Sequence, residues 1–316
     1  YREKNQEGQV FGGPMYVIKN GLPRKMLPLA YFFAIAGMIG CLPAFQSNQL
    51  IQITGDLAFS DIENFDVYGG LALASITGIV VIGGLKRIAE VASYLVPFMG
   101  SIYFGAMLIA IFLNLELVVP AFKLIFIDAF NGTAIAGGTF IGVLIYGVRR
   151  GAFSNEAGMG TESLVHGVAK VSNPVKQGLV AMTGPIFDTL IICTATALII
   201  LISGVWETST SQGVTLTSEA FNLLLGDLGG FILFACVICF GLSTIFTYSY
   251  YGATCARFIF GSFGMNFYIY LYIIGIFIYS IVPIDIAINI ADGAFAMMAI
   301  PTLISALWLA PKVMQE

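Results

Sequence analysis

The sequence predicts an all-α integral membrane protein, and three observations support that prediction. Of the 316 residues, 58% are hydrophobic and 10% are charged, and the mean hydropathy is +0.90. Soluble domains usually have roughly a quarter of their residues charged. The apolar residues also gather in runs long enough to cross a bilayer, which takes about 20 residues. Finally, the basic residues fall almost entirely on one side of the predicted spans.

Eight apolar runs are present, separated by short segments that contain the Gly, Pro, Asn and Asp residues that end helices. We expect each run to form a spanning helix, because backbone groups in hydrocarbon must bond within their own segment. Pro43 is expected to kink the first span, and Ser218–Leu225 to form a short amphipathic helix in an outer loop. The predicted spans are Met26–Thr54, Val67–Leu85, Ile88–Leu113, Ala134–Ala169, Gly178–Val205, Gly229–Phe260, Met265–Val282 and Ile284–Leu309.

The distribution of lysine and arginine predicts the orientation, since cytoplasmic loops are enriched in both. If the N-terminal segment is cytoplasmic, eleven basic residues fall inside and only Lys123 falls outside, while Arg149 and Arg150 lie within a span. We therefore predict one multi-pass transmembrane domain over residues 1–316 in the cell membrane, with a cytoplasmic N-terminal segment. The eleven residues are Arg2, Lys4, Lys19, Arg24, Lys25, Lys86, Arg87, Lys170, Lys176, Arg257 and Lys312.

The composition argues against several other classes of protein. The net charge is −4 and no basic stripe alternates with aromatic residues, so we expect no nucleic-acid partner. The Cys236-x-x-Cys239 pair has neither a second pair nor a nearby histidine to complete a metal site. An intramembrane enzyme would need a nucleophile with a base, or a metal cluster. The single histidine, His166, has no partner at helical spacing, so we expect no catalytic residues.

The run Ala134–Ala169 is too long and too polar for one ordinary spanning helix. Its centre, Arg149–Gly160, reads RRGAFSNEAGMG, with two arginines, a glutamate and three glycines inside an apolar run. We expect two half-helices joined by an unwound stretch near Ser154, because free backbone groups are tolerated only where protein or a cavity encloses them. Transporters use such breaks to bind substrates and ions. A plain kinked helix whose polar groups pair locally is the alternative.

Several motifs resemble those of the alanine/glycine:cation symporter family. Phe153–Gly160 resembles the signature of that family, and Phe11–Tyr16 resembles the motif that leads into its third core helix. The chain is therefore identified as a member of this family from about Gly8 to Pro311. Later segments that resemble family motifs, in the same order, are Asn173–Met182, Phe187–Thr189, Leu242–Ile245 and Ser249–Gly252.

The resemblance also implies a fold. The family is similar to the leucine-transporter class, in which ten core helices form two inverted repeats of five. By this resemblance, the chain begins just before core helix 3 and carries core helices 3–10, so core helices 1 and 2 are missing. Core helix 1 is the repeat partner of the broken helix and, in the family, contacts the substrate carboxylate and sodium. Half of the binding site is then expected to lie outside this sequence.

The function that the resemblance implies is sodium-coupled symport of a small neutral amino acid by alternating access. Alanine and glycine both fit, and the expected partners are that amino acid, Na+ and the lipid bilayer. Two alternatives remain: a transport-inactive fragment of such a symporter, or a proton-coupled transporter of the same fold that uses Glu156 or Glu162. The sequence leaves the oligomeric state open.

The predicted substrate site combines the first span with the broken helix. Gln46 and Asn48 resemble a Gln-x-Asn pattern of core helix 3, and their amides suit a zwitterion, although amides also bond between membrane helices. Phe153 and Met159 are expected to restrict the side-chain pocket to about a methyl group. Gly158 is expected to let the substrate approach closely. The complete set is Phe45, Gln46, Asn48, Phe153, Ser154, Asn155, Gly158, Met159 and Tyr248, the last at a position where the family often has tryptophan.

Ser243 and Thr244 are adjacent hydroxyl residues within an apolar run. The resemblance implies that their side-chain oxygens bind sodium; considered alone, each hydroxyl would be expected to bond to the preceding helical turn. Glu156 is expected to order the unwound backbone, because its charge would repel a substrate carboxylate. Asp188 and Asp292 are expected to make structural hydrogen bonds.

Overall fold

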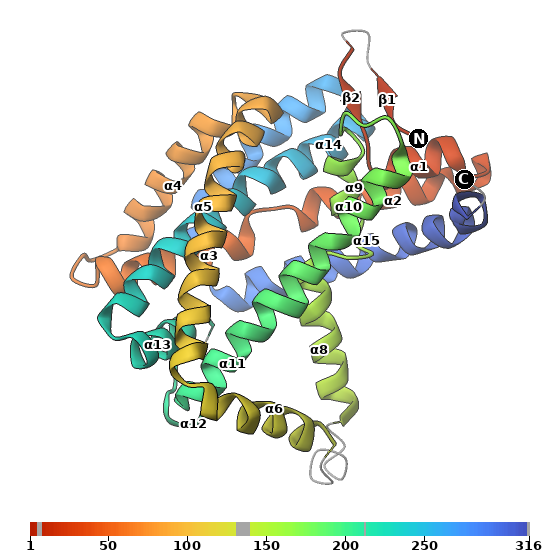
Figure 1. The fold of residues 1–316 in the computed structure, drawn as a ribbon. Helices are drawn as coiled ribbons and strands as arrows, with labels where there is room; N and C mark the ends of the chain where they lie inside the picture. The colour runs from red at the N-terminus through yellow and green to blue at the C-terminus, as the bar shows by residue number, and fades with distance from the viewer. Residues whose placement is uncertain (5–7, 131–139, 212, 315–316) are drawn as a thin grey trace. The chain divides into compact units, whose positions relative to one another are not determined.

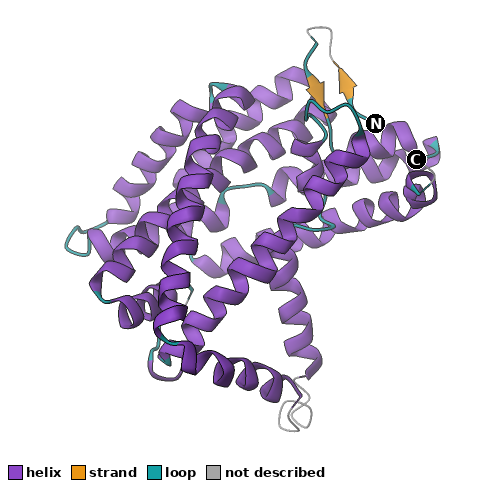
Figure 2. Cartoon of the chain, in the orientation of Figure 1, coloured by secondary structure: helices purple, strands orange, loops and turns teal. Residues whose placement is uncertain are grey.

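The computed structural model describes residues 1–4, 8–130, 140–211 and 213–314, and these ranges are mostly helical (Figures 1 and 2). Strands β1 (Glu3–Lys4) and β2 (Val10–Phe11) form a short antiparallel pair. Residues 134–139, at the start of the fourth predicted span, lie outside the described ranges. The helical elements are α1 Pro14–Gly21, η1 Arg24–Met26, α2 Leu27–Gly40, α3 Ala44–Ala58, α4 Phe65–Val81, α5 Gly84–Leu113, α6 Leu115–Phe130, α8 Phe140–Asn155, α9 Thr161–His166, α10 Pro174–Pro185, η2 Ile186–Cys193, α11 Thr194–Ser203, α12 Val205–Thr208, α13 Val214–Leu225, α14 Asp227–Ile281 and α15 Ile284–Val313.

Five helical stretches among the described residues are long and apolar enough to cross a membrane. They support the predicted multi-pass membrane protein, because a spanning helix needs about 20 apolar residues. The count of eight spans, the orientation and the inverted-repeat arrangement stay predictions. The five stretches are Arg24–Ala58, Gly84–Leu113, Pro174–Ser203, Asp227–Ile281 and Asn289–Val313.

Two of these stretches contain breaks where the sequence has a proline or a glycine. Helix α2 ends at Gly40 and α3 begins directly after Pro43, whose missing N–H prevents continuation of a helix. Within α14, Gly261 has φ 69° and ψ −158°, so this element consists of two consecutive helices. The break falls between the predicted spans that end at Phe260 and begin at Met265. The expected kink at Pro43 is also present.

The prediction is wrong for the segment that follows Leu113. The sequence predicts a connection there, whereas the structure has helix α6 with Pro120 inside it. Charged residues and the proline interrupt the apolar pattern of this segment in the sequence. The helix also has 16 residues, which is fewer than a spanning helix usually needs. The short helix predicted at Ser218–Leu225 is confirmed, and it begins earlier, at Val214.

The chain forms two compact units. Unit 1 comprises Tyr1–Val91, Asn155–Pro185 and Leu242–Glu316, and unit 2 comprises Ala92–Ser154 and Ile186–Gly241. In unit 1, α15 packs against α2 and α3, and α1 packs against α2. In unit 2, α11 packs against α6 and α13. The division between the units therefore passes through the broken-helix motif.

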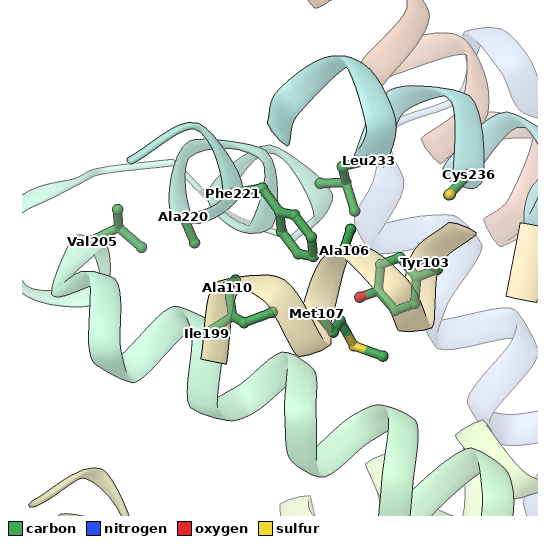
Figure 3. Close-up of a cluster of buried hydrophobic side chains, with 10 residues drawn as sticks. All are labelled: Tyr103, Ala106, Met107, Ala110, Ile199, Val205, Ala220, Phe221, Leu233 and Cys236. Atoms are coloured by element: carbon green, nitrogen blue, oxygen red, sulfur yellow. The ribbon is translucent and has the colours of Figure 1, made fainter. Parts of the chain in front are cut away.

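A cluster of buried side chains forms the core of unit 2 (Figure 3). Tyr103 of α5 stacks on Phe221 of α13, with ring centroids 5.7 Å apart. The Tyr103 hydroxyl lies 2.8 Å from the Thr196 hydroxyl of α11, so its polar end is satisfied while its ring is buried. Aromatic packing and apolar burial therefore join three helices. The cluster is Tyr103, Ala106, Met107, Ala110, Ile199, Val205, Ala220, Phe221, Leu233 and Cys236.

Candidate functional site: the broken helix

The structure has the predicted break. Helix α8 ends at Asn155, α9 begins at Thr161, and the residues between them are not helical. Glu156, Gly158 and Gly160 have φ angles of 55°, 81° and 90°. A positive φ is uncommon for a glutamate, and residues held in such conformations cluster at ligand sites and switch regions. The segment is thus an unwound stretch and not a simple kink.

Two side chains shape the break locally. The Asn155 Oδ1 atom accepts a hydrogen bond from the Ala157 backbone N–H at 2.9 Å, forming an Asx turn at the end of α8. The Ser163 hydroxyl donates to the Gly160 carbonyl at 2.7 Å, at the start of α9. Asn155, a predicted substrate residue, therefore uses its side-chain oxygen to hold the unwound backbone.

Glu156 connects the break to α9 and α14 within unit 1. The Tyr248 hydroxyl donates to Glu156 Oε1 at 2.5 Å, and the Thr161 hydroxyl donates to Glu156 Oε2. Tyr248 and Thr161 are both buried. Hydrogen bonds to an ionised carboxylate are stronger than neutral ones, so these two contacts hold Glu156 in place. This geometry agrees with the expected ordering role of Glu156, and it makes Tyr248 a hydrogen-bond donor to that carboxylate.

The end of the break packs closely against α1, α2 and α15. Met159 is buried, and its carbonyl accepts a hydrogen bond from the Thr302 hydroxyl at 3.2 Å. A Cβ atom at Gly160 would lie 2.5 Å from Pro14 Cγ and 2.6 Å from Thr302 Oγ1. Gly158 is different, since a Cβ atom there would meet only the Leu303 side chain, at 3.5 Å. Thr161 and Thr302 are not among the site residues predicted from the sequence. The local signal for each was a hydroxyl side chain within an apolar run.

In unit 2, the last turn of α8 meets the π-helical segment η2. The Ser154 hydroxyl donates to Asp188 Oδ2 at 2.6 Å, and the Thr189 hydroxyl donates to the same oxygen at 3.1 Å. The structural hydrogen bonding expected of Asp188 is therefore present. The predicted pocket residue Phe153 lies with its ring 5.2 Å from the Arg150 guanidinium carbon. Segment η2 is a π-helical stretch of eight residues, and π-helical geometry is frequent at functional sites.

The predicted substrate residues of the first span lie at the start of α3. Phe45 and Gln46 are half-buried, and Asn48 is buried. The Asn48 side-chain amide donates to the Val282 carbonyl at 2.6 Å and more weakly to the Tyr279 carbonyl at 3.4 Å. The final carbonyls of a helix have no intrahelical partner, and Asn48 satisfies such groups at the end of α14. The interhelical bonding considered as an alternative for Asn48 is the contact that the structure contains.

We expect Asn48→Ala to lower the stability of the full-length parent protein by about 1–3 kcal/mol, because buried carbonyls lose their donor. The measurement is the thermal unfolding midpoint in detergent. Gln49→Ala is the control, since Gln49 donates to Gln52 in an exposed pair, and its effect should stay within about 0.5 kcal/mol. Normal stability combined with lost alanine uptake would contradict a structural role for Asn48.

The predicted sodium residues lie in the first half of α14. Ser243 is buried, Thr244 is half-buried, and the Ser243 carbonyl accepts a hydrogen bond from the Thr247 hydroxyl at 2.8 Å. Over the described part of the chain, no group of three or more His, Cys, Asp or Glu residues is arranged to hold a metal ion. In transporters with broken helices, unwound backbone carbonyls and the C-terminal ends of half-helices coordinate Na+. Hydroxyl oxygens are what Ser243 and Thr244 would add.

Comparison with known proteins gives consistent matches over the whole chain. The model of the family described as "Sodium:alanine symporter family" matches residues 1–316. The chain is 36% identical to the uncharacterized transporter YflA of Bacillus subtilis, over 99% of this chain and 67% of that protein. It is 35% identical to the sodium/alanine symporter AgcS of Methanococcus maripaludis, over 100% of this chain and 70% of that protein. It is 33% identical to the "Probable sodium/glutamine symporter GlnT" of B. subtilis, over 99% of this chain and 65% of that protein.

Proposed function

Because the chain belongs to the sodium:alanine symporter family, we propose that it forms the larger part of a symporter that carries alanine or glycine together with Na+. Family membership makes it a membrane transport protein and not an enzyme. The observation that carries the proposal is the unwound stretch between α8 and α9, with positive φ at Glu156, Gly158 and Gly160, inside an apolar protein. Such a stretch frees backbone groups for a ligand where hydrocarbon would otherwise forbid it.

We place the amino-acid substrate against the backbone of the break. Gly158 is exposed and has no side chain, so a small zwitterion can approach the peptide groups there. In unit 1, Gln46 of α3 is the proposed polar partner, with Phe45 and Met159 restricting the side-chain pocket. Phe153 and Ser154, at the end of α8 in unit 2, stay predicted substrate residues. Asn48, Asn155 and Tyr248 support this site through the bonds described above, and Glu156 acts as a positioning residue.

We place Na+ at Ser243 and Thr244. Sodium shifts the conformational equilibrium of a carrier only as far as it binds one state better than the other. In the proposed cycle, Na+ stabilises the outward-open form, the amino acid binds at the break, the outer path closes, and both leave on the inner side. Weak oxygen ligands suit this cycle because the ion must also be released.

Uptake of labelled alanine and glycine into proteoliposomes tests the proposal, with the full-length parent protein and this chain alone as separate samples. We expect uptake by the full-length protein that requires a sodium gradient, and none by this chain alone. Uptake that follows a proton gradient without sodium would overturn the sodium assignment in favour of proton coupling. A folded full-length protein that accumulates neither amino acid would overturn the substrate assignment.

We expect Ser243→Ala to raise the sodium concentration for half-maximal uptake roughly tenfold, because the ion loses one oxygen whose interaction with a charge is worth about 1.5 kcal/mol. The measurement is uptake against sodium concentration at saturating alanine. Ser280→Ala is the matched control: Ser280 is also a buried serine of α14, and its hydroxyl bonds to the Ile276 carbonyl at 2.8 Å. Equal shifts in both variants, or no shift in Ser243→Ala, would argue against a sodium site.

A further inference from the structure

A cavity of about 1010 Å³ lies in unit 1, and none of the predicted substrate residues is among its described lining residues. Its walls come from segments that are far apart in the sequence. They are the N-terminal β-hairpin, the turn between α4 and α5, residues 168–171, and both halves of α14. The residues of the break in unit 1 and the residues that line this cavity are therefore different residues of that unit.

The cavity is strongly cationic. Arg2, Lys4, Lys86 and Lys170 line it, and its described lining contains no Asp or Glu. The ion pair between Lys19 and Glu3, at 2.8 Å, involves none of the four. Like charges gathered beside an apolar wall repel one another more strongly than they would in open water. An anion bound among them would relieve that repulsion.

Part of the cationic wall is held in place by a hydrogen bond. The Arg2 guanidinium donates to the Ala169 carbonyl at 2.9 Å, directly before Lys170 in the chain. Phosphate oxygens accept hydrogen bonds from lysine and arginine side chains. The cation cluster therefore has the chemistry of a phosphate site.

The remaining wall of the cavity is apolar, and it indicates which class of anion the cavity binds. Val81, Ile88, Met265 and Ile269 contribute hydrocarbon surface to the same cavity. A ligand that satisfies both kinds of wall carries a phosphate and hydrocarbon in one molecule. Basic pockets between membrane helices bind anionic lipid head groups in this way. The predicted orientation would put all four cations on the cytoplasmic side.

We propose that this cavity binds the phosphate head group of an anionic phospholipid. Arg2, Lys4, Lys86 and Lys170 supply the positive charge, and the apolar wall accommodates the start of the acyl chains. A preference for basic residues on one membrane side does not by itself produce such a site. Arg24 and Lys25, which are predicted to lie on the same side, are not among the cavity's described lining residues.

The test uses the full-length parent protein in detergent and titrates phosphatidylglycerol, with phosphatidylcholine as the neutral comparison. We expect phosphatidylglycerol alone to raise the unfolding temperature, since a ligand of the native state stabilises it by mass action. The double variant Lys86→Gln/Lys170→Gln should weaken apparent affinity about fivefold for each lysine removed. The double variant Arg24→Gln/Lys25→Gln keeps the same charge change outside the cavity and should retain the wild-type response.

Three outcomes would overturn the proposal. Equal weakening in the two double variants would show general attraction of lipid to a basic surface. An equal temperature shift with inorganic phosphate or glycerol phosphate would identify a soluble phosphate ligand in place of a lipid. If the Lys86/Lys170 double variant does not fold, native mass spectrometry of the single variants Lys86→Gln and Lys170→Gln replaces it, and retention of phosphatidylglycerol equal to wild type in both contradicts the site.

Discussion

Gly160→Ala is expected to destabilise the protein severely, lowering the free energy of unfolding by about 2–5 kcal/mol. Two effects add. Gly160 has φ 90°, and a left-handed conformation costs an L-residue roughly 1–2 kcal/mol. The new Cβ atom would also lie 2.5 Å from Pro14 Cγ and 2.9 Å from Phe33 Cε2, and overpacking of this kind costs typically about 1–3 kcal/mol.

Gly158→Ala separates these two effects. Gly158 has a similar φ of 81°, but its Cβ atom would make only an ordinary contact with Leu303 at 3.5 Å. We therefore expect only the backbone contribution, about 1–2 kcal/mol. The measurement is the thermal unfolding midpoint of both variants in the full-length parent protein. Equal loss of stability in the two would show that the close packing of Gly160 against α1 and α2 contributes nothing.

Glu156→Ala is expected to abolish sodium-driven alanine uptake. It removes the acceptor of two buried donors, the hydroxyls of Tyr248 and Thr161, and each orphaned hydroxyl costs about 1–3 kcal/mol. The unwound stretch then loses its connection to α14 and to the start of α9. Tyr248→Phe removes one of the two bonds and is expected to reduce uptake about 10- to 100-fold, since bonds to charged groups contribute about 1.5–3 kcal/mol.

Tyr251→Phe is the matched control for Tyr248→Phe. Tyr251 is buried in the same helix, with its ring centroid 5.7 Å from that of Tyr248, and its change should alter uptake by less than about twofold. The double variant Glu156→Ala/Tyr248→Phe completes the test through the free energy of unfolding, because two changes that break the same bond are not additive. Fully additive losses, or equal losses in Tyr248→Phe and Tyr251→Phe, would rule out the hydrogen bond as the cause.

Local features of the sequence were enough to predict the class of protein and where its helices break. Hydrophobic runs must form helices in a membrane because the backbone has no other partner there. Pro43 and Gly261 interrupt helices for reasons contained in their own covalent structure, the missing N–H of proline and the missing Cβ of glycine. The same reasoning located the unwound stretch within Phe153–Gly160. The prediction was wrong at α6, because one proline and a few charged residues led us to assign an apolar helix to a connection.

The partners of the polar side chains were decided only by the tertiary structure. Tyr248 lies 92 residues from Glu156 in the chain, and no local pattern distinguishes a tyrosine that donates to a carboxylate from one that forms a pocket wall. Asn48 is likewise separated from the Val282 carbonyl that it satisfies. The cavity with Arg2, Lys86 and Lys170 depends on three segments folding together. Helix formation depends on neighbours within a few residues, whereas a hydrogen bond or a charge cluster depends on where distant segments pack.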